Sequence, residues 1–193
     1  MSRQYWNEGI TWATASGTAI ATSVTETILF PNVTIPGNYL QDGRVLKLRL
    51  YGAYGTTTGS NTLTFRVRWG GVAGTVLASS GATVLTASSG GGASMTAIWS
   101  ANLLIQTRSN GSTGTVFTNG DLFYYSATVP TGGTIANYGM PSQLVSGSTG
   151  GSTPVAVTAD LTADTALSVT AQWGTSNAAN SIRGDMYTAE SLN

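Results

Sequence analysis

The chain has no histidine and no cysteine, and lysine occurs only once, at position 47. Without cysteine it cannot form disulfides, thiol nucleophiles or thiolate metal sites, and without histidine it cannot form a Ser-His-Asp triad or most zinc sites. A glycosidase-type pair of carboxylates stays open, although the eight acidic residues lie in no acid-rich motif. We therefore expect no enzymatic activity and no cofactor or metal.

Charge of either sign is also scarce, because only 8% of the residues are charged and the formal net charge is zero. A typical soluble domain has roughly 25% charged residues. The hydrophobic fraction of 41% is too high for a disordered chain. A surface whose polarity comes from hydroxyls and amides has little charge repulsion between copies, which favours a homo-oligomer.

Two other classes of partner are not expected. The basic residues are scattered, apart from Arg66 and Arg68, so the chain has little with which to neutralise the phosphates of a nucleic acid. No apolar run is long enough to span a bilayer, and residues 1–6 lack the apolar segment of a secretory signal. We expect a protein made in the cytoplasm that binds neither nucleic acid nor membrane.

From Thr18 onward, apolar and polar residues alternate with the period of two that is typical of half-buried strands in antiparallel sheets. Runs rich in glycine, serine and asparagine separate these segments, as expected for turns, and one such turn is predicted at residues 119–121. A helix stays open over residues 95–105, where Ile98 and Leu104 interrupt the polar face. The residues predicted to face the core are Ile20, Val24, Ile28, Phe30, Leu46, Leu48, Leu50, Leu63, Phe65, Val67, Trp69, Val76, Leu77, Met95, Ala97, Trp99, Ala101, Leu103, Ile105, Phe117, Phe123, Tyr125, Ala127, Val129, Val155, Val157, Ala159, Leu161, Leu167, Val169, Ala171 and Trp173.

These segments predict an all-β fold, a two-sheet antiparallel sandwich of about 8–10 strands arranged like a jelly roll. An immunoglobulin-type sandwich needs only about 100 residues, and the sequence has no repeat of fixed period that would indicate a solenoid or a propeller. Residues 1–17 lack the alternation. We therefore expect an N-terminal arm over residues 1–17 and one sandwich domain over residues 18–193.

Aromatic residues outside the core faces are the candidate binding residues. Tyr5, Trp6 and Trp12 lie in the arm, which we expect to dock on its own sandwich or on a neighbour because water is an unfavourable environment for them. Tyr51 points away from the leucines of its strand, and Tyr54 follows at the start of a glycine-rich loop. An exposed pair of this kind could stack on sugar rings or anchor a protein interface, and the enrichment of tyrosine at interfaces favours the second.

Three stretches carry a resemblance to a known class of protein: LTFRVRWGGVAGTV at residues 63–76, NGSTGTVF at 110–117 and LSVTAQWGTSNAANSI at 167–182. Together they resemble the small β-rich structural proteins of tailed bacteriophages, of the decoration or minor structural type. The resemblance covers about residues 30–193 and leaves out the arm. It implies a virion component that forms oligomers, with trimers common among such jelly rolls.

Among virion components, we expect a capsid decoration, or cement, protein that binds the outer shell as an oligomer and reinforces it. Its partners would be copies of itself and the major capsid protein, and its location would be the virion, after synthesis in the host cytoplasm. A tail or fibre component that binds a receptor or a carbohydrate is one alternative. A free carbohydrate-binding module is another, with Tyr51 and Tyr54 as the platform for a glycan.

Overall fold

The computed structural model describes residues 7–12, 15–56, 61–85, 95, 97–125, 140–147 and 153–192, with the backbone alone at residues 7, 12 and 140. No helix occurs among these residues, and the fold is all-β, as the sequence predicts. The strands are β1 (Asn7–Trp12), β2 (Ile20–Ala21), β3 (Thr27–Ile28), β4 (Val33–Ile35), β5 (Val45–Gly55), β6 (Asn61–Trp69), β7 (Thr75–Ser79), β8 (Thr83–Leu85), β9 (Ala97–Ser109), β10 (Gly114–Tyr125), β11 (Met140–Ser146), β12 (Val157–Ala159), β13 (Thr165–Trp173) and β14 (Ser181–Leu192).

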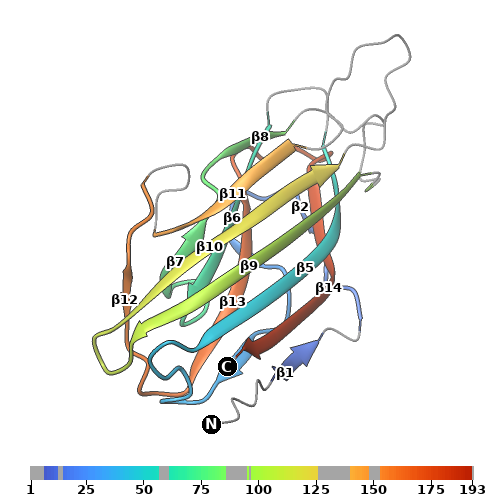
Figure 1. Ribbon diagram of the computed structural model, residues 1–193. Coiled ribbons are helices and arrows are strands. Elements are labelled where there is room, and N and C mark those ends of the chain that lie inside the picture. Colours follow the sequence, from blue (N-terminus) through green and yellow to red (C-terminus); the bar gives the residue numbers. More distant parts are fainter. Residues whose placement is uncertain are drawn as a thin grey trace.

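All these strands belong to one antiparallel sheet, which is strongly curled (Figure 1). Its hydrogen-bonded order is β1-β14-β5-β9-β10-β11-β7-β6-β13-β3, while β2, β4, β8 and β12 pair with β14, β13, β6 and β10. The curl brings β6 behind β9 and β10, where the ring of Phe65 lies 4.6 Å from that of Trp99 and 6.1 Å from that of Tyr124. The core therefore lies inside the curl.

The long strands bury the side chains that the alternation predicts. β9 is a strand throughout, which excludes the helix at residues 97–105. Each large apolar side chain removed from water stabilises the fold by about 1.5–3 kcal/mol. In β5, β6, β9 and β13 the buried predicted residues are Leu46, Leu48, Leu50, Leu63, Phe65, Val67, Trp69, Ala97, Trp99, Ala101, Leu103, Ile105, Leu167, Val169, Ala171 and Trp173.

The prediction for β10 is wrong in two respects. The strand runs without a break through residues 119–121, where the sequence predicts a turn, because β9 pairs with all three of these residues on one side and β11 on the other. Gly120 permits close pairing, since a Cβ there would lie 2.4 Å from the Cβ of Leu103. The core face is also shifted by one residue: the buried side chains are Val116, Leu122 and Tyr124 instead of Phe117, Phe123 and Tyr125.

The N-terminal segment is part of the sheet. β1 pairs with the end of β14, the amide of Gly17 donates to the carbonyl of Gly184 (2.7 Å), and β2 pairs with the start of β14. The chain then crosses to the other end of the strand order, where β3 and β4 pair with β13. Gly17 lies beside Leu29, whose carbonyl oxygen would be 2.6 Å from a Cβ at position 17. β1 and β2 thus form one edge of the curl and β3 and β4 the other, and the two edges meet at a seam.

Two predictions concern this part of the chain. The predicted boundary between arm and domain at residue 17 lies between β1 and β2, which both pair with β14, and it stays a prediction. The predicted first strand from Ile20 to Phe30 is interrupted, and Val24 in its middle is exposed. The break occurs because residues 22–26 cross from one edge strand of the curl to the other.

Phe30 fills the seam from the inside. It is buried, and its ring centroid lies 5.0 Å from that of Tyr187 on β14 and 6.1 Å from that of Trp99 on β9. Gly184 makes this position available, because a Cβ there would lie 2.4 Å from the Phe30 ring. Phe30 therefore joins the β13 edge of the curl to the β14 edge.

One side-chain hydrogen bond joins β1 to the loop that precedes β5, and a second contact holds its donor within that loop. The hydroxyl of Tyr39 donates to Oε2 of Glu8 (2.7 Å), and the guanidinium of Arg44 lies 4.4 Å from the centre of the Tyr39 ring. Burial and the nearby Glu8 carboxylate raise the pKa of Tyr39, so its hydroxyl remains a hydrogen-bond donor. The segment from residue 7 onward is thus attached by backbone and side-chain contacts together.

Candidate interface

The outward side of β5, β9, β10 and β14 is the candidate functional surface, and we call it the outer face. Cross-strand pairing aligns its side chains in rows that run from one strand to the next. Two rows are largely apolar, and the two below them are largely polar. From top to bottom the rows are Arg183, Ala53, Ile98 and Tyr125; Met186, Tyr51, Ser100 and Phe123; Thr188, Arg49, Asn102 and Asp121; and Glu190, Lys47, Leu104 and Asn119.

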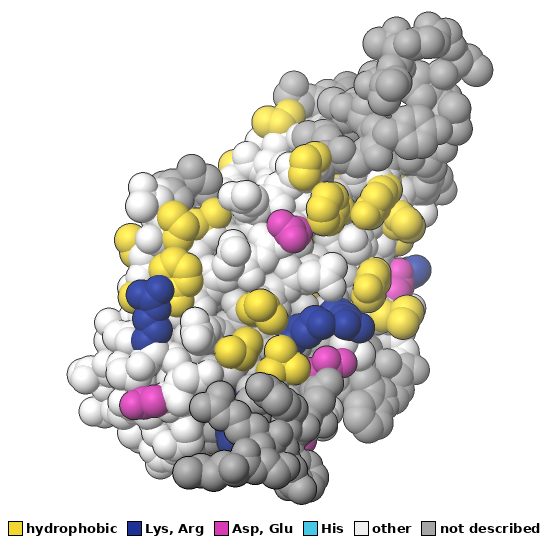
Figure 2. Space-filling view, in the orientation of Figure 1, with side chains coloured by type: hydrophobic (Ala, Val, Ile, Leu, Met, Phe, Trp, Pro, Cys, Tyr) yellow, Lys and Arg dark blue, Asp and Glu magenta, His cyan; other side chains and the backbone are white. Residues whose placement is uncertain are grey.

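Four large side chains of the upper rows are exposed around one shallow depression, and we call them the apolar patch. Their exposed fractions are 60% for Ile98, 61% for Met186, 42% for Tyr51 and 37% for Tyr125. The depression has a volume of about 390 Å³, and Ser100 and Asp185 also line it. Figure 2 shows apolar side chains gathered over the upper ends of β9 and β10, whereas charged side chains are sparse.

Single exposed apolar residues are ordinary on protein surfaces, but a contiguous group marks a surface that binds something. The patch continues onto Phe123, whose ring is stacked 6.2 Å from that of Tyr125. Paired strands hold the backbone of these residues in place, so little backbone entropy is lost when their side chains are covered. The arrangement suits a protein–protein contact or the stacking of a planar apolar surface.

Only one of the five predicted binding residues is placed in this patch. Tyr51 is exposed there, as predicted, and its role in an interface stays a prediction. Tyr5 and Trp6 lie outside the described residues, and Trp12 pairs through its backbone with Thr188 at the end of β1.

The prediction that Tyr54 is exposed is wrong. It is 3% exposed and points into the core, where its ring meets that of Tyr124 edge-on at 5.7 Å. Burial raises its pKa to about 12. Since β5 extends to Gly55, residue 54 falls on the same face as Leu46, Leu48 and Leu50. The predicted Tyr51–Tyr54 platform does not exist, and Tyr125 lies beside Tyr51 in the depression instead.

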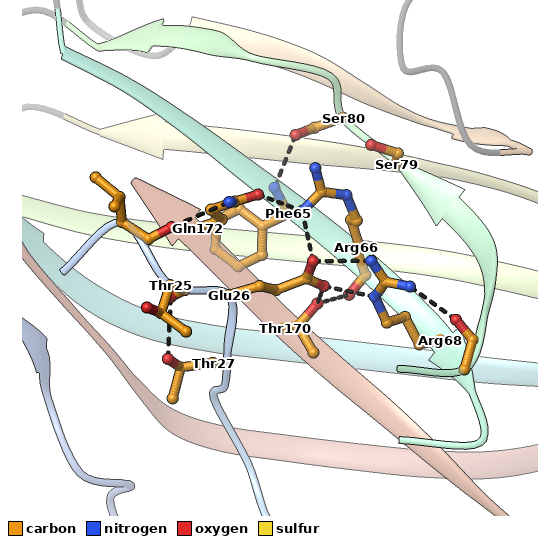
Figure 3. A network of polar contacts seen from close by, with 12 residues as sticks. Thr25, Glu26, Thr27, Phe65, Arg66, Arg68, Ser79, Ser80, Thr170 and Gln172 are labelled. Atoms are coloured by element: carbon orange, nitrogen blue, oxygen red, sulfur yellow. Dashed lines mark hydrogen bonds and ion pairs between the residues drawn. The ribbon is translucent and has the colours of Figure 1, made fainter. Parts of the chain in front are cut away.

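A polar network lies on another part of the curled sheet, over β6 and β13 (Figure 3). The carboxylate of Glu26 accepts from Nε (2.5 Å) and Nη2 (2.8 Å) of Arg68, from Nη1 of Arg66 (2.8 Å) and from the hydroxyl of Thr170 (2.5 Å). Gln172 accepts from the same Arg66 nitrogen, at 2.8 Å. Glu26 belongs to the crossing segment between β2 and β3, so the network attaches that segment to the sheet.

The charges of this network determine the ionisation of Glu26. Burial alone would raise the pKa of its carboxyl group. The hydrogen bonds from Arg68 and Thr170 and the positive charges of Arg66 and Arg68 outweigh that effect, so the pKa lies below the ordinary value of 4.5. Glu26 is therefore ionised at neutral pH. Its contacts attach the segment between β2 and β3 to the sheet.

The part of the chain that the structure describes contains no group of three or more histidine, cysteine, aspartate or glutamate residues suited to hold a metal ion. These residues also form no helix that is long and apolar enough to cross a membrane.

No protein-family model, curated protein or solved structure matches this chain.

Proposed function

We propose that this protein is a non-enzymatic structural component of a tailed-phage particle, a decoration protein that contacts other virion subunits through the outer face. The observation that supports the proposal is the apolar patch, four large exposed side chains around one depression on a rigid sheet. Such a group of aromatic and aliphatic side chains is typical of the centre of a protein interface. The resemblance of residues 63–76, 110–117 and 167–182 to phage structural proteins gives the class of particle.

The low charge of the chain also fits a role in assembly. A chain with 8% charged residues and no net charge has little electrostatic repulsion between neighbouring copies. In a symmetric shell each contact is repeated, so weak individual interfaces combine into strong attachment through avidity. We further propose that the curled sheet is a variant of the two-layered jelly roll, with β14-β5-β9-β10 as one layer and β11-β7-β6-β13 as the other.

A second candidate is carbohydrate binding, in a tail fibre or in a free module. It is favoured by Tyr51 and Tyr125, two exposed aromatic rings that line the same depression. The hydroxyl of Ser100 and the carboxylate of Asp185 lie at the same place and could accept hydrogen bonds from a sugar. Aromatic rings of this kind can stack on the apolar face of a pyranose.

Counting copies of the chain in purified particles of its phage, by quantitative mass spectrometry, separates these candidates. A decoration protein is expected at a copy number comparable with that of the major shell subunit, because shell symmetry repeats its site. A handful of copies would indicate a tail or fibre component instead. Complete absence from particles would contradict a virion role and leave the free carbohydrate-binding module.

A further inference from the structure

We propose that the subunit covering the apolar patch is a second copy of this chain, docked face to face about a two-fold axis that runs along β9. This inference rests on the proposed function, because it names the partner of the same outer face. The three observations behind it are the order of the strands, the distribution of charge across them, and the exposed apolar residues along the central one.

β9 is the central strand of the series β14-β5-β9-β10-β11, with β5 on one side and β10 on the other. Rotation by 180° about an axis parallel to β9, between two opposed faces, places β5 of one copy opposite β10 of the other. The central strand then lies opposite itself. Packed sheets with aligned strands lie about 10 Å apart, which leaves room for one layer of side chains from each copy.

The charges of the outer face are complementary under this rotation. Arg49 on β5 and Asp121 on β10 both pair with Asn102 on β9, so they lie at equal distances on opposite sides of the axis. Adjacent strands are about 4.8 Å apart, so the backbones of Arg49 and Asp121 are separated by about 10 Å, with Asn102 between them. Neither residue has an ion-pair partner within the described part of the chain, and both are exposed. In the dimer, Arg49 of each copy faces Asp121 of the other.

The apolar residues are complementary in the same way. Ile98 and Leu104 lie on β9, are 60% and 46% exposed, and each would meet its own counterpart on the axis. Tyr51 and Phe123 both pair with Ser100, so the tyrosine of one copy would pack on the phenylalanine of the other. A two-fold interface requires such self-complementarity, because each residue pair occurs twice. The two-fold pairing replaces the trimer that the phage resemblance implies.

Site-specific cross-linking of the purified protein tests this geometry, and the absence of native cysteine makes each introduced thiol unique. Opposed Cα atoms about 10 Å apart exceed the reach of a disulfide, so a short bismaleimide is the suitable reagent. We expect Ile98→Cys and Leu104→Cys to give covalent dimers in high yield. Val24→Cys, as exposed as Leu104 at 46% but on the opposite side of the molecule, should give no covalent dimer.

Charge reversal tests the pairing of Arg49 with Asp121. Arg49→Asp and Asp121→Arg should each weaken the dimer by roughly tenfold or more, measured by sedimentation, because each places like charges opposite each other twice. The double variant should restore dimerisation, whereas a merely destabilising substitution would not be rescued. Circular dichroism checks that each variant is folded.

A monomer at all concentrations, a trimer, or equal cross-linking at position 24 would overturn the two-fold proposal. If the chain nevertheless occurs in many copies per particle, the decoration role stands and another virion protein covers the patch. If the dimer forms but particles lack the chain, the virion proposal fails and the two-fold inference remains.

Discussion

Replacement of Phe30 by alanine is expected to destabilise the protein by about 3–5 kcal/mol, the usual cost of removing a large buried aromatic side chain. Phe30 packs against Tyr187 and Trp99 at the point where the two edges of the curled sheet meet. The substitution leaves a cavity at the seam, beside the rings of Tyr187 and Trp99. Equilibrium unfolding in urea measures the change, with the midpoint moving at constant slope.

The loss of stability in Phe30→Ala should be concentrated at the seam. Amide exchange of Gly17 and Leu29, whose hydrogen bonds run to β14 and β13, should accelerate more than exchange in β9. Val24→Ala is the matched control in the same segment, because Val24 is exposed and its truncation should cost no more than about 0.5 kcal/mol. A cost below about 1 kcal/mol for Phe30→Ala would show that residues 15–35 lie over the fold without contributing to its core.

Glu26→Gln is expected to destabilise the protein by about 1–3 kcal/mol at pH 7, because two partly buried arginines lose the charge that they surround. The difference should depend on pH. Since the pKa of Glu26 is lower in the folded state than its ordinary value of 4.5, the carboxylate stabilises the fold above that value. This contribution is lost as the pH falls through the lower, folded-state pKa, where the protonated Glu26 resembles glutamine.

The free energies of unfolding of the native protein and of Glu26→Gln should therefore converge between pH 7 and strongly acidic conditions. Asp185→Asn is the matched control, because Asp185 also contacts an arginine, Arg183, at 2.6 Å, but in a more exposed pair. Removing such a surface pair should cost at most about 1 kcal/mol. The role of the network would be contradicted if the two free energies of unfolding were equal at pH 7. It would also be contradicted if their difference stayed constant as the pH falls.

The sequence predicts the core of this fold well where alternation is long and regular. Leu46, Leu48 and Leu50 show a period that could be extended four residues further, and that extension would place Tyr54 in the core. The sequence instead predicts an exposed Tyr51–Tyr54 pair, because the glycines around Tyr54 suggest a loop. Strand pairing with β9 and β14 on either side overrides that local tendency.

The same competition explains the error in β10. Residues 119–121 have the composition of a turn, but paired strands on both sides keep this stretch extended, and that information comes from distant parts of the chain. When a turn is assumed at residues 119–121, the alternation places Tyr125 on the core face, whereas in the structure Tyr125 is exposed. Ile98 is different, because its conflict with the polar face of its own strand is visible in the sequence. An apolar residue out of phase with its strand is a signal for an exposed contact.

Incorporation of the Ile98→Lys variant into particles is the most direct test of the claim that the apolar patch is buried against another virion subunit. Ile98 is 60% exposed in the single chain, so the substitution should leave folding intact while placing a charge at the centre of the contact. The account predicts that particles assembled with Ile98→Lys lose most of this protein, whereas particles assembled with Val24→Lys keep it. Equal incorporation of the two folded variants would contradict it.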